Sequence, residues 1–272
     1  MPSTYAHYRL GKEVEARLGG KEGERVARYR ELFYIGLHGP DILFYYGALG
    51  SNPVNAVGFG LHEESGAAYF ERARRLILKR RDSEAALVYS YGVLCHFALD
   101  VTCHPYVEEK VQASGITHTE IEVEFDRKLM LLDGLNPVTQ VLTDHIHPES
   151  RWAEVIAPFY PGVTAQQVEK SLHKMISLNK LLLAKNPLKR GIILGVLRLT
   201  GNYQGMHGLI INPKGNPDCR DSNDRLFDLY NQAVDLAGKL MDGFEDFLAG
   251  KAGLDPICDY NFEGRYPKEK RV

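Results

Sequence analysis

Long hydrophobic runs and an excess of one charge are both missing from this 272-residue sequence. Its longest apolar stretches, such as residues 191–197, are too short to span a bilayer. Residues 1–20 contain no apolar core of signal-peptide length. The 33 basic and 35 acidic residues nearly cancel, which argues against a dedicated nucleic-acid coat or a polybasic membrane anchor. These absences predict a cytoplasmic protein without a transmembrane segment.

Cysteine is scarce, and the four residues present show none of the paired spacings typical of a zinc knuckle or a redox site. Cys95 and Cys103 would lie roughly 12 Å apart along the axis of a continuous helix, which is too far for a disulfide. Reduced, buried thiols are therefore expected, as in other cytoplasmic proteins.

Strand-like alternation of apolar and polar residues is also missing, and helical periodicity dominates. With 44% hydrophobic residues, the chain is long enough for a sizeable core. The sequence therefore predicts an all-α fold with a single domain over residues 1–272. Residues 36–60 and 201–221 are Gly- and Pro-rich breaks, and the second is a candidate lid or substrate loop. Helices are expected over residues 23–36, 65–80, 82–104, 117–132, 164–185, 187–200 and 222–250.

Local signals set several of the expected helix ends. Thr117 and Thr164 each begin a capping-box pattern, so helices should start just after them. Pro105 is expected to end the helix of residues 82–104, because a proline ring disfavours helical backbone in the residue before it.

The sequence does contain metal-binding side chains at helical spacing. His96, Asp100 and His104 lie four residues apart in the apolar stretch "GVLCHFALDVTCHPYV", and His118 and Glu122 repeat that step. Side chains four residues apart share one helix face, with β-carbons about 6 Å apart, so each pair could hold a cation from one side. An unpaired carboxylate in such surroundings would be costly. Imidazole combined with carboxylate favours zinc, with iron, manganese or nickel as alternatives.

Further candidates lie upstream, at turn-rich positions. His7 follows "PSTYA", Asp41 stands in "GLHGPDILFYY", and His62 stands in "GFGLHEESG", where it is expected to open a helix. His145 and His147 form a spare HxH in "TDHIHPES", which we interpret as a polar loop.

The order of these residues resembles the zinc-dependent phospholipase C / P1 nuclease superfamily over residues 1–130. The HxxxDxxxH spacing is similar to that of the N-terminal domain of glycosylphosphatidylinositol-specific phospholipase D. The resemblance implies an all-α fold with up to three zinc ions at the bottom of a cleft. It implies these ligand groups: Asp41, His62, His96 and Asp100 for one ion; His104, His118 and Glu122 for a second; and His7 with a bridging carboxylate for a third.

Two positions depart from the pattern of the secreted members. Those members place a histidine six residues after the HxxxD aspartate, where this chain has Tyr106, and His104 is expected to substitute for it. They also use the amine of an N-terminal tryptophan, whereas this sequence begins Met-Pro. Two zinc ions are therefore expected, with a third as the upper limit.

The activity that the resemblance implies is hydrolysis of a phosphodiester by a metal-activated water. Asp100 would bridge the ions, and Asp41 would serve as a ligand or as the base that orients the water. The expected substrate is a phosphodiester-containing small molecule or a phospholipid headgroup. A nuclease of the P1 type and a metal-binding homologue without catalysis remain as alternatives.

The sequence lacks the motifs of two other classes of all-α metalloprotein. No histidine is followed directly by Asp, as HD phosphohydrolases require, and none has Glu three residues before it, as ferritin-like di-iron proteins require. The densest basic run, residues 72–81, is expected to be a solvated helix face, so no specific nucleic-acid surface is evident. Aromatic residues that could line the mouth of a lipid-binding cleft are Tyr34, Phe44, Tyr45 and Tyr46.

Overall fold

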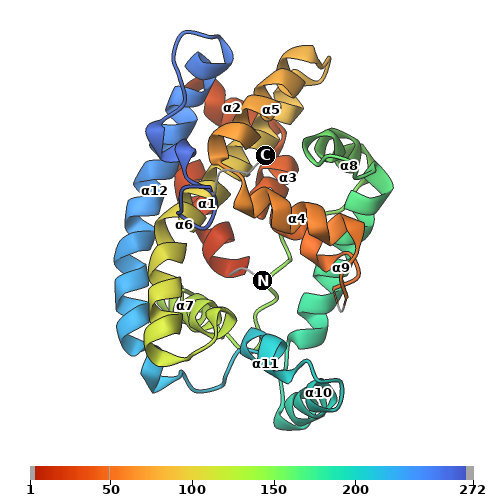
Figure 1. Cartoon of the computed structure of the whole chain (residues 1–272), viewed down its shortest axis with the longest axis vertical. Coiled ribbons are helices and arrows are strands. Elements are labelled where there is room, and N and C mark those ends of the chain that lie inside the picture. Colours follow the sequence, from red (N-terminus) through yellow and green to blue (C-terminus); the bar gives the residue numbers. More distant parts are fainter. Residues whose placement is uncertain (1–3, 49, 268–272) are drawn as a thin grey trace.

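The computed structural model describes residues 4–48 and 50–267, and within them the regular elements are helices (Figure 1), which confirms the all-α prediction. Ser65 and Asn261 form an isolated bridge. The α-helices are α1 (Thr4–Arg17), α2 (Gly20–Arg28), α3 (Arg30–Gly36), α4 (Pro53–Glu63), α5 (Gly66–Lys79), α6 (Ser83–Ser114), α7 (His118–Leu132), α8 (Ser150–Ile156), α9 (Ala165–Leu182), α10 (Pro187–Leu199), α11 (Tyr203–Met206) and α12 (Arg220–Leu248). The 3-10 helices are η1 (Gly39–Tyr45), η2 (Ala157–Phe159), η3 (His207–Leu209), η4 (Pro217–Cys219) and η5 (Pro256–Asp259).

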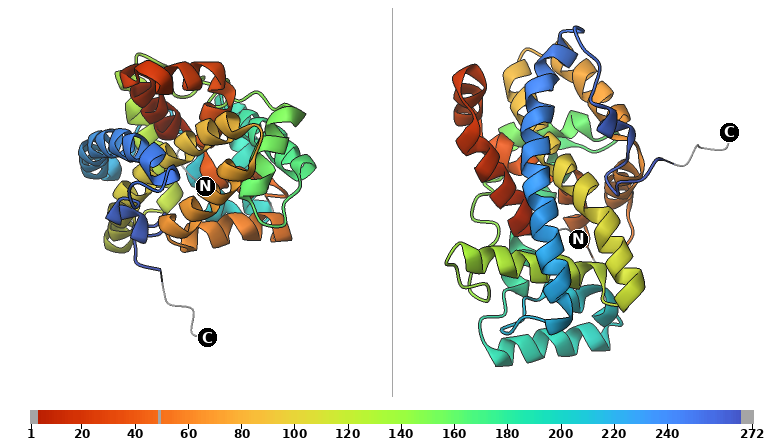
Figure 2. Two further views of the ribbon diagram at one scale, coloured as in Figure 1. Left: turned by 90° about the horizontal axis from the view of Figure 1, so that it is seen from above. Right: turned by 90° about the vertical axis from the view of Figure 1, so that its left-hand side faces the viewer.

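Helix α6 is the centre of the core. It packs most extensively against α12, which runs beside it (Figure 2), and against α3. From Ala85 to Val101 every side chain of α6 is buried, as expected of a helix that is apolar on all sides. Within the described chain it is the one helix long and apolar enough to cross a membrane, but 94% of its most apolar window is buried inside the fold. That burial is the pattern of a core helix.

The prediction that Pro105 ends this helix is wrong, because α6 continues to Ser114. An interior proline removes one backbone hydrogen bond and typically costs about 3 kcal/mol or more. The packing of α6 against its neighbours outweighs that cost. Gly264, with φ of +69°, lies over the defect: a β-carbon there would come within 2.4 Å of the Pro105 ring and 2.8 Å of the Val101 carbonyl oxygen.

Two glycines set the crossing of α3 and α6. A β-carbon on Gly92 would lie 2.3 Å from the carbonyl oxygen of Phe33, and one on Gly36 would lie 2.5 Å from that of Tyr89. The two backbones therefore touch with no side chain between them. This close approach holds the turn that follows α3 against the middle of α6.

The segment 36–60, predicted as a break, contains η1 and α4 instead. Asn52 starts α4 with a reciprocal capping box, since its side chain accepts from the amide of Asn55, and the Asn55 side chain accepts from the amide of Asn52. His62 consequently lies in the last turn of α4 and does not open the next helix. The predicted helix 23–36 is divided at Tyr29 into α2 and α3.

The predicted lid, residues 201–221, contains α11, η3 and η4 and is bound to α7. Gly208 packs on the first turn of α7, where a β-carbon would lie 2.7 Å from the hydroxyl of Thr119. Arg127 donates hydrogen bonds to the carbonyl oxygens of Asn212 and Pro213. Movement of this segment as a lid stays a prediction.

Candidate metal centre

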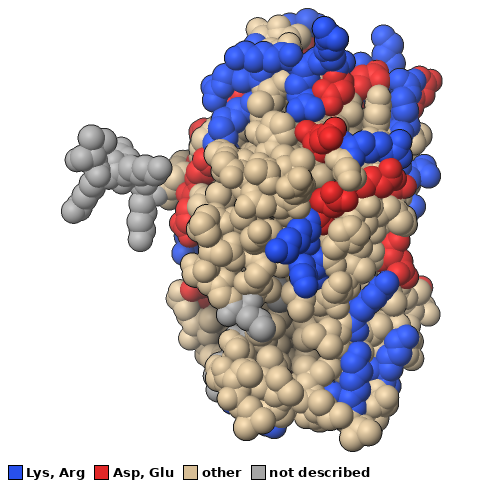
Figure 3. Space-filling view, turned by 90° about the vertical axis from the view of Figure 1, so that its right-hand side faces the viewer, with Lys and Arg blue, Asp and Glu red and all other residues tan. Residues whose placement is uncertain are grey.

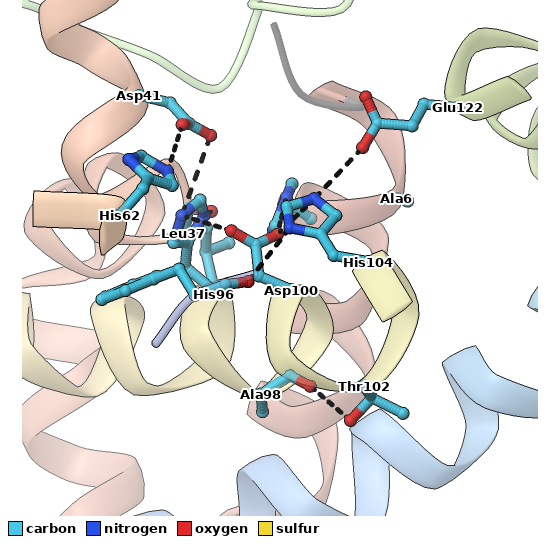
Figure 4. Close-up of polar contacts among 12 residues, drawn as sticks. Ala6, Leu37, Asp41, His62, His96, Ala98, Asp100, Thr102, His104 and Glu122 are labelled. Atoms are coloured by element: carbon cyan, nitrogen blue, oxygen red, sulfur yellow. Dashed lines mark hydrogen bonds and ion pairs between the residues drawn. The ribbon is translucent and has the colours of Figure 1, made fainter. Parts of the chain in front are cut away.

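All eight predicted site residues lie together, on the side of α6 that faces the first turns of α1 and α7, the turn after α3 and the end of α4. Figure 4 labels Asp41, His62, His96, Asp100, His104 and Glu122 among them. The regular spacing on α6 supplies a row of three side chains, and the remaining five come from four other elements. Their nitrogen and oxygen atoms form three groups, each with ligand atoms within 4.8 Å of one another. The groups are Asp41, His62 and His96; His104, His118 and Glu122; and His7, His96 and Asp100.

The first group joins η1, α4 and α6. The Nε2 atom of His62 lies 2.9 Å from Oδ1 of Asp41, and Nε2 of His96 lies 3.8 Å from Oδ2 of the same carboxylate. All three side chains are buried. This is the set that the resemblance implies for one ion, except that Asp100 is not among its members.

The second group agrees with the predicted set. Oε1 of Glu122 lies 3.2 Å from Nε2 of His118 and 3.4 Å from Nε2 of His104. His104, predicted to replace the histidine that is absent at Tyr106, therefore faces the same point as the HxxxE pair.

Asp100 lies between the groups. Its Oδ1 is 3.2 Å from Nε2 of His7 and 3.7 Å from Nε2 of His104, and its Oδ2 is 3.1 Å from Nε2 of His96. The ring of His7 stacks on that of His96 at 4.4 Å. One carboxylate thus faces a histidine from each of the three groups, which is the position that a bridging ligand needs.

Backbone carbonyls orient three of the histidines. The Nδ1 atoms of His62, His96 and His104 donate hydrogen bonds to the carbonyl oxygens of Gly58 at 2.8 Å, Leu37 at 3.2 Å and Phe262 at 3.0 Å. In the neutral ring, each bond fixes the tautomer and directs the electron pair of Nε2 toward the centre. Outer hydrogen bonds of this kind are typical of metal-bound histidine.

Asp126 supports the histidine of α1. Its carboxylate accepts hydrogen bonds from the backbone amides of Tyr5 at 3.0 Å and Ala6 at 2.8 Å, in the first turn of the helix. These amides have no partner inside a helix, so a carboxylate from α7 accepts their hydrogen bonds and holds His7 against α6.

Gly39 provides room for the ring of His96. Its φ is +44°, a value that side-chain-bearing residues rarely adopt, and a β-carbon there would lie 2.5 Å from Cδ2 of His96. The turn "HGPD" therefore approaches α6 as closely as it does because this position has no side chain.

Opposite charges determine the pKa values inside the centre. Burial opposes a charge on His104, but the carboxylates of Asp100 and Glu122 outweigh it and raise its pKa to about 10. Burial likewise opposes the charge of Asp100, yet His96 and His104 hold its pKa well below its usual range. His118 and His104 lower the pKa of Glu122 against the same effect. In the metal-free protein, His104 is therefore cationic at neutral pH and both carboxylates are ionised.

Several buried atoms at the centre have no hydrogen-bond partner within the part of the chain that the structure describes. Buried polar atoms normally find a partner, and those that do not require an explanation. Here they belong to residues that converge from different elements, and they are nitrogen and carboxylate oxygen, the donor types that zinc accepts. The residues present therefore fit a zinc cluster. The atoms are Nδ1 of His7, Oδ2 of Asp41, Nε2 of His96, Oδ2 of Asp100 and Oε2 of Glu122.

A cavity of about 410 Å³ opens over these residues. Asp41 and Glu122 form part of its lining, whereas Asp100 lies beneath it. Phe44 stacks on Phe59 with ring centroids 4.4 Å apart, and this pair makes an apolar wall. The full lining is Asp41, Phe44, Phe59, Gly60, His62, Glu63, His104, His118, Thr119, Glu122 and Glu263.

Sequence reasoning missed several of these features. Of the four aromatic residues proposed for the cleft mouth, Phe44 lines the cavity, and Phe59 was not considered. Glu263 and the Phe262 carbonyl come from the far end of the chain, and no local sequence motif predicts that they lie at the site. Asp126 could have been found only from the fold, because its partners are the amides at positions 5 and 6.

The interpretation of the HxH as a polar loop is wrong for one of its two histidines. His145 is buried, stacks on Tyr8 at 4.0 Å, and places its Nε2 2.8 Å from that of His38. Burial lowers the pKa of His145 to about 3 and that of His38 well below its usual value, so both rings are neutral. His147 is exposed and pairs with Glu31.

A helical fold with three converging histidine–carboxylate groups defines a candidate multinuclear metal protein. Residues 6–167 match the family model described as zinc dependent phospholipase C. The match covers more than half of the chain and all eight candidate residues, so the chain belongs to this family. Searches of curated proteins and of solved structures find no match. The finer likeness to the phospholipase D domain stays a prediction.

Proposed function

We propose that this protein is a zinc-dependent phosphodiester hydrolase that acts on the headgroup bond of a phospholipid. The observation that carries the proposal is that side chains from five elements converge at one centre beside an accessible cavity. Five of them, His7, Asp41, His96, Asp100 and Glu122, each keep a buried donor atom without a hydrogen-bond partner among the described residues. Zinc bound there would supply a water that ionises near neutral pH and a positive charge for the phosphoryl oxygens.

The chain's own residues would orient the metal ligands and the attacking water. Hydrogen bonds from His62, His96 and His104 to backbone carbonyls keep each Nε2 aimed at the centre. Asp41 lines the cavity, so its carboxylate can accept the proton of an attacking water. Asp100 is absent from the described lining of this cavity and faces His7, His96 and His104, which suits a bridging role better than a role as base.

The lining of the cavity favours a cationic headgroup. The stacked Phe44 and Phe59 rings provide an apolar and π-electron surface, and Glu63 and Glu263 add two carboxylates at the same opening. Aromatic rings with carboxylates are the usual recognition elements for an alkylammonium group. Among the residues that the structure describes, no Lys or Arg lines the cavity, so a polyanionic nucleic acid fits this opening less well than a single phosphodiester with a positive end.

The location that we propose is the cytoplasm. The four cysteines are free and buried, which suits a reducing compartment. The alternative of a non-catalytic homologue with a closed cleft is disfavoured by the open cavity over the ligand residues.

Turnover of two chromogenic substrates tests the proposal: a phosphocholine ester and a simple phosphodiester. Wild type should hydrolyse both. Asp100→Ala should lower the rate of turnover by more than about 100-fold, because even the loss of a residue that only hydrogen-bonds to a metal ligand costs 10- to 100-fold in metal affinity or activity. Asp144→Ala, which removes an exposed carboxylate, serves as the matched control. Equal turnover by wild type and Asp100→Ala would refute the proposed role of the centre. Absence of turnover by wild type and both variants would favour the alternative of a metal-binding homologue without catalysis.

A further inference from the structure

Helix α10 presents an apolar row to solvent. Leu188, Ile192, Val196 and Leu199 are 76%, 58%, 52% and 90% exposed. At about 100° per residue these four positions fall within an arc of roughly 80°. One helix face therefore exposes four large aliphatic side chains side by side.

The opposite face of α10 already provides the packing that holds the helix in place. Leu197 is buried with Ala184 and Ile210 in a small cluster of its own, against which Ile193 and Met206 also pack. The outer row makes no contribution to that cluster. Large contiguous apolar patches on a soluble surface usually mark an interaction site.

The sequence that contains this helix carries charge of one sign. Residues 170–217 contain eight lysines and arginines and no Asp or Glu, although the whole chain has a formal charge of −2. On the face drawn in Figure 3, the lower end of the molecule, where α10 lies in Figure 1, is tan and blue without red. The eight basic residues are Lys170, Lys174, Lys180, Lys185, Lys189, Arg190, Arg198 and Lys214.

Part of this charge is free to meet a partner. Lys189 and Arg190 are used within the fold, since Lys189 donates to the carbonyl oxygen of Leu183 and Arg190 to that of Ile211. Lys185 and Lys214 are exposed and have no hydrogen bond or ion pair with any described residue. Free ammonium groups in the same segment as an apolar row match a surface with phosphates above hydrocarbon.

The segment after α10 adjoins the rim of the cavity. Gly208 packs against Thr119 and Glu120 at the start of α7, and Thr119 lines the cavity. A surface bound by α10 would therefore be held near the opening over the candidate metal centre.

We infer that α10 is an interfacial helix that docks the protein on an anionic phospholipid bilayer. Its apolar row would enter the headgroup region while the lysines contact lipid phosphates, as in other helices that lie in a membrane surface. A second copy of this chain would cover the row but would bring its own positive segment. A neutral apolar groove would leave the acid-free run of 48 residues unexplained, and the proposed phospholipid substrate favours an anionic bilayer over an acidic protein groove. The inference deepens the proposed function and rests on it for the choice of a lipid partner.

Sedimentation of the full chain with vesicles tests this inference. The vesicles are phosphatidylcholine alone and an equal mixture with phosphatidylglycerol. Wild type should pellet with the mixed vesicles, and the double variant Leu188→Gln/Ile192→Gln should bind at least about tenfold more weakly. Lys185→Gln/Lys214→Gln should lose binding to the mixed vesicles in particular. Leu78→Gln removes a leucine of similar exposure, 61%, on α5 at the other end of the molecule and should bind as wild type does.

Other measurements separate this inference from the proposed function. Every one of these variants should hydrolyse a soluble phosphodiester at the wild-type rate. Soluble turnover without vesicle binding overturns the docking surface alone, whereas vesicle binding without any turnover overturns only the hydrolase. A wild-type dimer in sedimentation equilibrium that Leu188→Gln/Ile192→Gln dissociates would also overturn the inference, because a second copy would then cover the row.

Discussion

The part of the chain that matches the family model and the part that follows it contribute differently to the centre. Residues 6–167 supply every candidate ligand. Residues after 167 supply no candidate ligand among the described residues, yet they provide α12 beside α6, the Phe262 carbonyl that orients His104, and Glu263 at the cavity. The comparison teaches that all the candidate ligands come from the first region, whereas the orientation of His104 and one carboxylate of the cavity lining also depend on the second.

Metal removal should affect both regions. Chelation should abolish turnover and lower the melting temperature by about 10 °C, since a ligand present at 1,000 times its Kd adds about 4 kcal/mol to the free energy of unfolding. Hydrogen exchange should also speed up at residues 261–265, because His104 would no longer be held between the metal and Phe262. Unchanged hydrogen exchange at residues 261–265 would contradict the proposed link between the two regions.

Gly39→Ala should weaken metal binding by about 10- to 100-fold, because the new β-carbon pushes the ring of His96 out of position. Gly115→Ala is the control, since its φ of +71° gives comparable backbone strain with no atom within 4 Å of the new β-carbon. Zinc affinities measured by competition with a chelator compare the two variants. Equal losses would show that backbone strain, and not contact with His96, is responsible.

Glu263→Gln should change specificity and leave metal binding alone. We expect KM for a phosphocholine ester to rise about fivefold and KM for an uncharged-headgroup phosphodiester to stay constant, because the substitution removes a carboxylate from the cavity. The Arg265→Gln variant is a nearby control outside the lining. Equal changes in KM for both substrates would contradict the proposed headgroup site.

Zinc binding should release protons at neutral pH. The metal-free pKa of His104 is raised to about 10, so its ring is protonated at pH 7 and must lose that proton to become a ligand. Calorimetry at pH 7 in buffers of different ionisation enthalpy should detect about one proton or more per chain. His104→Gln should release fewer protons than wild type, and an unchanged number would contradict the proposed ligand role of His104.

The sequence was most informative where chemistry follows local spacing. His96, Asp100 and His104 share a face because they lie four residues apart on one helix. The capping box at Thr164 is confirmed in full, whereas at Thr117 the hydrogen bond from the Glu120 amide to the threonine side chain confirms the helix start, and the Glu120 side chain accepts from Asn216. Predictions failed where contacts between residues far apart in the sequence determine the structure. α6 passes through Pro105 because its neighbours bury it on all sides, and His145 is buried by contacts with Tyr8 and His38 that no local pattern shows.

The helix boundary near His62 failed for a different reason. The signal that starts α4, Asn52 followed by Asn55, was present in the sequence but was read as part of a Gly- and Pro-rich break. The position of Asp41 opposite His62 depends on the crossing at Gly36 and Gly92, which follows from close backbone contact and not from a periodic pattern.

Anomalous diffraction at the zinc edge from crystals of the zinc-loaded protein is the most direct test of the centre. The account predicts one peak within about 2.0–2.2 Å of nitrogen or oxygen atoms of Asp41, His62 and His96, and a second at the same distance from His104, His118 and Glu122. Asp100 should lie between the two peaks. The absence of a peak at both groups, in crystals soaked in excess zinc, would contradict the proposed zinc centre.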